Sequence, residues 1–103
     1  MEVNINKENF KSEVLNYDGL VIVDFYGTWC MPCRMLSPVL EKVANEKNIK
    51  LAKVDIDEND ELIRKFRIMS VPTLKFFKDG REVDSLIGLV SENTLLDIIS
   101  KIE

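Results

Sequence analysis

Hydrophobic and polar positions follow two alternating patterns along the chain, one typical of buried strands and the other of amphipathic helices. Residues 20–25 form a nearly continuous apolar run that is rich in β-branched side chains, as in a strand covered on both faces. Between residues 30 and 47, apolar side chains instead recur at spacings of three and four, which predicts an amphipathic helix.

These patterns predict strands and helices in the order β-α-β-α-β-α-β-β-α. The expected strands are residues 3–5, 20–25, 49–55, 73–77 and 82–87. The expected helices are one capped by Asn6 and ending near Gly19, one from Cys30 to Lys47, one capped by Asp57 or Asn59 and ending at Phe66, and one capped by Ser91. Alternating units favour parallel strands, and a tight turn at residues 78–80 adds an antiparallel hairpin. The sequence therefore predicts an α/β fold with a mixed central sheet and helices on both faces.

The length and composition limit the class of protein. With 103 residues the chain has room for one domain, residues 1–103. Its 46% hydrophobic and 31% charged residues exclude intrinsic disorder, and a net charge of −4 argues against nucleic-acid binding. No apolar stretch approaches the roughly 20 residues that span a bilayer, and no signal-peptide pattern opens the chain. We therefore expect a cytoplasmic monomer with no nucleic-acid or membrane partner.

The only two cysteines, Cys30 and Cys33, lie at the predicted junction of strand and helix, and the chain has no histidine. At a helix start, unpaired N–H groups and the helix dipole stabilise the thiolate, which is the form of Cys30 that attacks disulfides. Cys33 follows one turn later on the same face, where it can resolve a mixed disulfide, and we expect it to be the less exposed of the two. The pair falls short of the four ligands of a zinc site. Redox chemistry is favoured, while Cu(I) transfer and an inert buried pair remain alternatives.

Several segments, in the same order and spacing over essentially the whole chain, resemble the thioredoxin family. They are Asp24-Phe25-Tyr26-Gly27-Thr28-Trp29-Cys30-Met31-Pro32-Cys33, Lys53-Val54-Asp55, Val71-Pro72-Thr73-Leu74 and Gly88. The resemblance implies the thioredoxin fold, with a five-stranded sheet flanked by four helices, and dithiol–disulfide exchange with client proteins. It also implies a reversible Cys30–Cys33 disulfide as the redox centre, with no cofactor and no metal.

Asp24 interrupts an otherwise apolar strand. From the residues alone, it marks either an irregular strand register or a buried carboxylate with a partner. The resemblance implies that Asp24 is buried behind the cysteines, has a pKa raised by desolvation, and accepts the proton of Cys33. It also makes Lys53, in the next strand, the ionic neighbour of Asp24. Without the resemblance, Lys53 reads as an exposed strand lysine.

Pro72 follows Val71 at the start of a predicted strand. Most X–Pro bonds are trans, but the resemblance implies a cis bond beside the cysteines, with the Val71 backbone free to pair with an extended client segment. Around Cys30 it implies an apolar surface on which client proteins dock. This client-docking surface comprises Trp29, Met31, Pro32, Met69, Val71, Gly88 and Leu89. Without the resemblance, Met69 and Leu89 are scattered surface or core residues.

The dipeptide between the cysteines departs from the family pattern, because Met31-Pro32 stands where Gly-Pro is usual. Methionine adds no charge and no hydrogen-bond donor, in contrast to the histidine of disulfide isomerases and strong oxidants. We therefore expect a protein that reduces disulfides and not an oxidase or isomerase.

The predicted function is that of a small protein-disulfide reductase in which Cys30 attacks and Cys33 resolves. The resemblance implies recycling by a thioredoxin reductase and clients such as ribonucleotide reductase, peroxiredoxin and methionine sulfoxide reductase. The main alternative is a redox-independent binding subunit that uses the same fold to clamp a partner.

Overall fold

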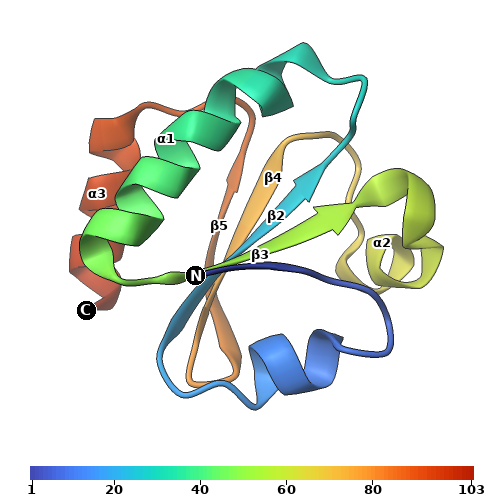
Figure 1. Ribbon diagram of the computed structural model, residues 1–103, viewed down its shortest axis with the longest axis horizontal. Helices are drawn as coiled ribbons and strands as arrows, with labels where there is room; N and C mark the ends of the chain where they lie inside the picture. The colour runs from blue at the N-terminus through green and yellow to red at the C-terminus, as the bar shows by residue number, and fades with distance from the viewer.

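The computed structural model describes residues 1–103 and contains a central sheet with helices around it (Figure 1). The strands are β1 (Glu2–Asn4), β2 (Leu20–Tyr26), β3 (Lys50–Asp55), β4 (Thr73–Lys78) and β5 (Arg81–Ile87). The helices are the π-helical η1 (Lys11–Leu15), α1 (Met31–Lys47), α2 (Asp60–Phe66) and α3 (Glu92–Ile102), and a single 3₁₀ turn, η2 (Ile56–Glu58), precedes α2. The predicted five strands and four helices are confirmed.

The five strands lie in the order β1-β3-β2-β4-β5. β3 is parallel to both β1 and β2, whereas β4 is antiparallel to β2 and to β5. The sheet is therefore mixed, as the sequence predicts. β2 is central, and all but the last of its residues are buried, which explains its uninterrupted apolar run.

The two faces of the sheet carry separate cores. Helices α1 and α3 cover one face, and η1 and α2 cover the other (Figure 1). Side chains along β2 alternate between them, so Ile22 packs toward α1 and α3 while Val23 and Phe25 pack on the opposite face. Asp24 follows this alternation and points to the α1 side. Cys33 and Leu36 are on the buried face of α1, so the side chains of Asp24 and Cys33 both lie between the sheet and α1.

The first helix differs from the prediction. Asn6 does open a helical turn, since its side-chain oxygen accepts the N–H groups of Glu8 and Asn9 at 2.9 and 3.0 Å. The regular helix nevertheless covers only Lys11–Leu15 and is π-helical. The hydrogen bond from Asn16 N–H to the Lys11 carbonyl, five residues back, defines this wider turn.

The start of α2, the third predicted helix, also differs from the prediction. Asn59 precedes α2, as one of the two predicted caps, but its side chain makes no capping hydrogen bond. Its amide donates to the carbonyl of Asp55 at 2.8 Å, because the inserted turn η2 redirects the chain. By contrast, Ser91 caps α3 as predicted and accepts the N–H of Thr94 at 3.1 Å.

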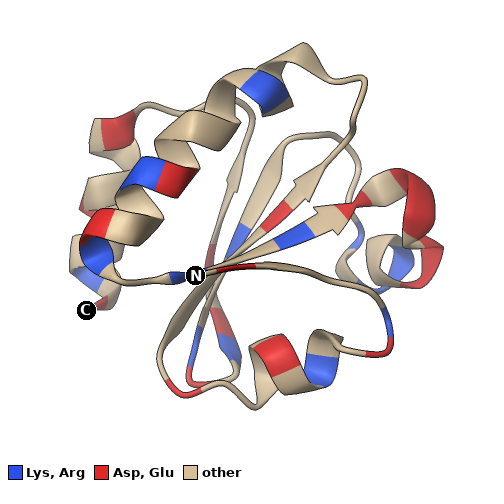
Figure 2. Ribbon diagram, in the orientation of Figure 1, with Lys and Arg blue, Asp and Glu red and all other residues tan.

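Charged side chains of both signs are spread over the helices and strand ends (Figure 2). Acidic residues gather at η2 and the first turn of α2, where Asp57 and Glu58 are separated by Asn59 from Asp60 and Glu61. None of the helices has the length and apolar character needed to cross a membrane.

Candidate active site

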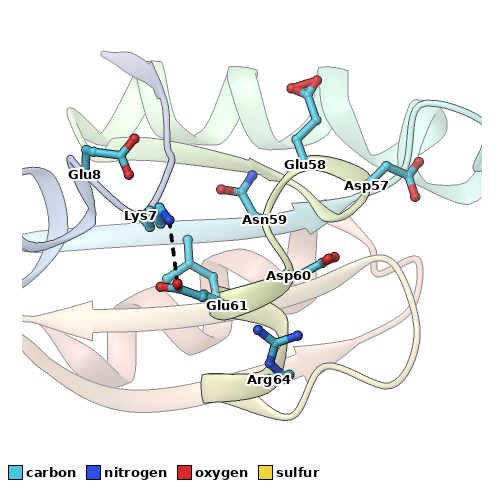
Figure 3. A pocket seen from close by; sticks show the side chains of 9 residues that line it. Lys7, Glu8, Asp57, Glu58, Asn59, Asp60, Glu61 and Arg64 are labelled. Atoms are coloured by element: carbon cyan, nitrogen blue, oxygen red, sulfur yellow. Dashed lines mark ion pairs between the residues drawn. The ribbon is translucent and has the colours of Figure 1, made fainter.

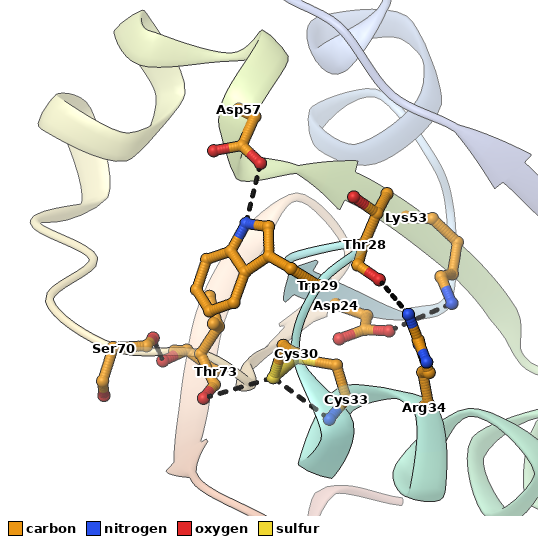
Figure 4. Close-up of a disulfide and its surroundings, with 11 residues drawn as sticks. Asp24, Thr28, Trp29, Cys30, Cys33, Arg34, Lys53, Asp57, Ser70 and Thr73 are labelled. Atoms are coloured by element: carbon orange, nitrogen blue, oxygen red, sulfur yellow. Dashed lines mark hydrogen bonds and ion pairs between the residues drawn. A yellow bond between two sulfur atoms is a disulfide. The ribbon is translucent and has the colours of Figure 1, made fainter.

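The two cysteines form a disulfide at the start of α1 (Figure 4). Cys30 is the N-cap, and its Sγ accepts the backbone N–H of Cys33 at 3.2 Å. A first-turn N–H group therefore points at the sulfur that would carry the thiolate charge. Pro32 fits this turn because an N–H group there has no partner within the helix.

The expected difference in exposure between the cysteines is wrong. Cys30 is 4% exposed and Cys33 is 5% exposed, so the two disulfide-bonded cysteines are buried to nearly the same extent. The exposure of the two cysteines therefore does not distinguish them. Cys30, at the helix terminus, is the one that receives the hydrogen bond.

Asp24 is 1% exposed and forms an ion pair with Lys53, with 3.3 Å between Oδ2 and Nζ. The two residues are direct partners in the register of β2 and β3, which is why their side chains meet. The other carboxylate oxygen, Oδ1, is buried without a hydrogen-bond partner. The ion pair predicted for Asp24 is thus present, and one oxygen of the carboxylate remains available to take up a proton.

Burial raises the pKa of Asp24 from 3.8 to about 6, and the positive charge of Lys53 opposes this rise. Desolvation dominates because the carboxylate has lost its water and gained one charged partner in return. A carboxyl group with a pKa near 6 changes its protonation within about one unit of neutrality. This matches the raised pKa that the resemblance implies and suits a proton acceptor.

The Val71–Pro72 peptide bond is cis and lies beside the disulfide, as the resemblance implies. The sulfur of Cys30 is 3.8 Å from the carbonyl oxygen of Val71. On the far side of the loop, Gly88 donates its N–H to the Pro72 carbonyl at 2.8 Å. Gly88 has φ of +90°, and a Cβ there would meet no atom within 4 Å, so its outer face is open to an approaching backbone.

Apolar side chains are exposed around the disulfide, as expected for the client-docking surface. Met69 is 95% exposed and Trp29 is 62% exposed, which is unusual for such large apolar side chains on an isolated chain. Met31, Pro32 and Leu89 are also exposed, whereas Val71 is partly buried and Pro72, beneath them, is buried. The predicted surface does not include Met35 and Ile87, which are also exposed apolar residues. For Met35 the helical period was a usable signal, because this residue lies outside the buried stripe of α1 that contains Leu36 and Leu40. Ile87 ends β5, a strand with no buried residue.

Trp29 is fixed by two residues to which the sequence analysis gave no such role. Its indole N–H donates to Oδ2 of Asp57 at 2.9 Å (Figure 4). The ring also lies against Gly27, where an added Cβ would be 2.8 Å from Cε2 of the indole. Beside Trp29 is an apolar cavity of about 170 Å³, lined by Trp29, Ile56, Ile63, Ile68, Met69, Ser70 and Val71. The isoleucines come from η2, α2 and the following loop, so only the fold reveals that they meet.

A second cavity, of about 390 Å³, is lined by charged residues of η2 and α2 together with Lys7 and Glu8 (Figure 3). The ammonium of Lys7 is 3.6 Å from the carboxylate of Glu61, and both are well exposed. This cavity has one apolar lining residue, Leu62, and contains neither cysteine. No group of three or more Cys, Asp or Glu side chains is arranged to hold a metal ion.

A redox-active cysteine pair at a helix start, next to a mixed sheet, defines the chain as a thiol–disulfide oxidoreductase. A sequence profile of the thioredoxin family matches residues 2–101. The chain is 41% identical to a thioredoxin of Rickettsia bellii over 97% of each chain. It is 42% identical to a thioredoxin of Porphyra purpurea, over 94% of this chain and 92% of the relative. A thioredoxin of Mycobacterium tuberculosis is 39% identical, over 97% of this chain and 88% of the relative. The protein belongs to the thioredoxin family of protein-disulfide oxidoreductases.

Proposed function

We propose that this protein reduces disulfides in client proteins, with Cys30 as nucleophile and Cys33 as resolving thiol. The observation that carries the proposal is the position of Cys30 as the N-cap of α1, with the Cys33 N–H directed at its sulfur. Such a position favours the thiolate at neutral pH. The exposed apolar surface around it suits an extended client segment, which would pair with the backbone at Val71.

The reaction proceeds in two exchanges. The Cys30 thiolate attacks one sulfur of the client disulfide, and the other client sulfur leaves as a thiolate. Cys33 then loses its proton to Asp24 and attacks Cys30, which releases the second client sulfur and forms the Cys30–Cys33 disulfide. Two electrons pass from the cysteine pair to the client. Lys53 limits the rise in the pKa of Asp24, so that the carboxylate is ionised when the proton arrives.

The oxidised protein must then be reduced, and a thioredoxin reductase is the donor that family membership indicates. The client proteins that this protein reduces would include ribonucleotide reductase, peroxiredoxin and methionine sulfoxide reductase. We place this cycle in the cytoplasm, where thiols are kept reduced, and in a monomer with residues 1–103 as its single domain. The disulfide itself is the redox group, with no further cofactor.

The reduction potential of the Cys30–Cys33 pair tests the proposal. The pair is equilibrated in defined thiol–disulfide buffers, and the reduced fraction is measured by alkylation and mass spectrometry. A value near roughly −270 mV, the figure characteristic of thioredoxins, supports a reductase. A value near roughly −200 mV or above would place the protein with glutaredoxins and isomerases and would overturn the assignment.

The binding-subunit alternative is tested with the double variant Cys30→Ser/Cys33→Ser. A reductase loses all turnover of a protein disulfide in this variant. A clamp retains its partner affinity and its biological effect, and that outcome would replace the proposed function. The single variant Cys33→Ser is the matched control, because it should stop at the mixed disulfide with Cys30.

A further inference from the structure

The polar contacts that begin at Asp24 continue beyond Lys53 to the surface of α1. The ammonium of Lys53 is 3.3 Å from Oδ2 of Asp24 and also 3.3 Å from Oγ of Ser37. The hydroxyl of Ser37 in turn donates to Oε2 of Glu41 at 3.0 Å. Asp24 is buried and Glu41 is exposed, so four side chains form one continuous line from the interior to solvent.

The direction of these hydrogen bonds follows from the groups involved. An ammonium has no lone pair, so Lys53 is the donor and the Ser37 oxygen is the acceptor. The Ser37 proton is then left for the Glu41 carboxylate. The spacing also fits the helix, because Cys33, Ser37 and Glu41 are each four residues apart and therefore share one side of α1. The same helix side thus carries the resolving cysteine and the hydroxyl that reaches Lys53.

Several other charged or titratable groups lie near Lys53 or act on Asp24. Asp55 of β3 and Glu58 of η2 line the same cavity as Lys53. The negative charge of Glu2, on β1, contributes to the raised pKa of Asp24. The Tyr26 ring of β2 lies 4.7 Å from the ammonium, and burial, with the nearby acids, raises the pKa of its hydroxyl, so the ring is neutral. On α1, Arg34 is engaged elsewhere, since it donates to the Thr28 carbonyl at 3.0 Å.

Among all these neighbours, only Asp24 and Ser37 lie close enough to Lys53 for a hydrogen bond or ion pair. Lys53 is 12% exposed at the side chain, so its ammonium has partial access to water and to the other acids. Without the Ser37 oxygen, the flexible lysine side chain would have one directed partner in place of two. Its charge would then spend less time beside Asp24.

We propose that Ser37 is a positioning residue that holds the Lys53 ammonium beside Asp24 and thereby helps Asp24 to release the proton received from Cys33. Glu41 fixes the hydroxyl so that its oxygen faces Lys53. The inference rests on the proposed function, in which Asp24 is the proton acceptor. Its consequence is that an exposed face of α1 influences the buried acid without touching either cysteine.

The test compares Ser37→Ala with Ser37→Thr, which keeps the hydroxyl, and with Ser100→Ala on α3. Ser100 is an exposed helical serine that bonds only to the carbonyl of Asp97, so it is a matched control. The midpoint of the Asp24 titration is measured in the oxidised protein by carbon NMR of the carboxyl group. We expect Ser37→Ala to raise it by roughly half a pH unit, about threefold in proton affinity. Ser37→Thr and Ser100→Ala should leave it in place, and Lys53→Met should raise it further.

The pH profile of the resolving step, followed as release of a reduced client from the mixed disulfide, should move upward with the titration. The inference is overturned if Ser37→Ala behaves as Ser100→Ala does while Lys53→Met shifts the midpoint. It is also overturned if Ser37→Thr shifts it as far as Ser37→Ala. A failure of the proposed function looks different, because Asp24→Asn would then leave the resolving step and its pH profile unchanged.

Discussion

Asp24 shows how the environment of one residue determines its chemistry. The carboxylate is paired on one oxygen and unpaired on the other, within a layer of apolar side chains. An ionised group in such a place costs free energy, which is the physical meaning of its raised pKa. The sequence alone left Asp24 open between an irregular register and a buried acid. Its ionic partner could be named only by resemblance, since strand order decides which residue of β3 faces it.

The cost of ionising Asp24 predicts a pH-dependent effect of Asp24→Asn on stability. Because the pKa is raised from 3.8 to about 6 in the folded state, the native protein loses stability as pH rises through this window. The variant carries no such charge, so its advantage over the parent should grow by on the order of 2–3 kcal/mol between about pH 4 and pH 8. Urea unfolding at both pH values measures it. An advantage that is the same at both values would show that the buried charge is not its source.

At the scale of elements, the long periodic segments were predicted best. β2, α1 and α3 lie within one or two residues of their predicted bounds, because β2 is a continuous apolar run and the apolar residues of the two helices follow the helical period. The first helix was predicted too long, since a polar cap and three apolar residues do not distinguish an α-helix from a π-helical turn. The 3₁₀ turn η2 was missed, although it carries the carboxylate that binds Trp29. Short elements depend on tertiary contacts that local pattern does not contain.

The link between β5 and α3 depends on the conformation of Gly88, at φ of +90°. We expect Gly88→Ala to destabilise the fold by about 1 kcal/mol or more, because a Cβ disfavours this region. Gly88→Asn should cost less, since asparagine tolerates positive φ better. Urea denaturation of the three proteins gives the order. If alanine costs no more than asparagine, the conformation at this position is not what requires glycine.

On the scale of the whole molecule, one face of the sheet carries the candidate active site and the other carries a purely structural core. The face under α1 and α3 holds Asp24 and leads to the disulfide. The opposite face is packed around a cluster of phenylalanine rings. The ring centre of Phe10 lies 5.3 Å from that of Phe66 and 6.0 Å from that of Phe77. The mixed α/β architecture was predictable from the alternation of elements. The strand order and the joining of distant aromatic residues were not, because they depend on chain topology.

This division predicts a separation of stability from redox properties. Phe10→Ala should destabilise the protein by roughly 3–5 kcal/mol, because it removes a buried ring from the group that joins η1, α2 and β4. The reduction potential of the Cys30–Cys33 pair should remain that of the parent under conditions where the variant is folded. Unfolding curves and thiol–disulfide equilibria measure the two quantities. A changed potential in the folded variant would show that the two faces are coupled.

The position of Trp29 has a practical consequence. It is the only tryptophan in the chain, it directly precedes Cys30, and its indole N–H donates to Asp57. The protein therefore carries its own fluorophore next to the group whose covalent state changes. We expect emission from this one ring to change when the disulfide opens or closes and when a client binds over it, so that both events can be followed without any added label.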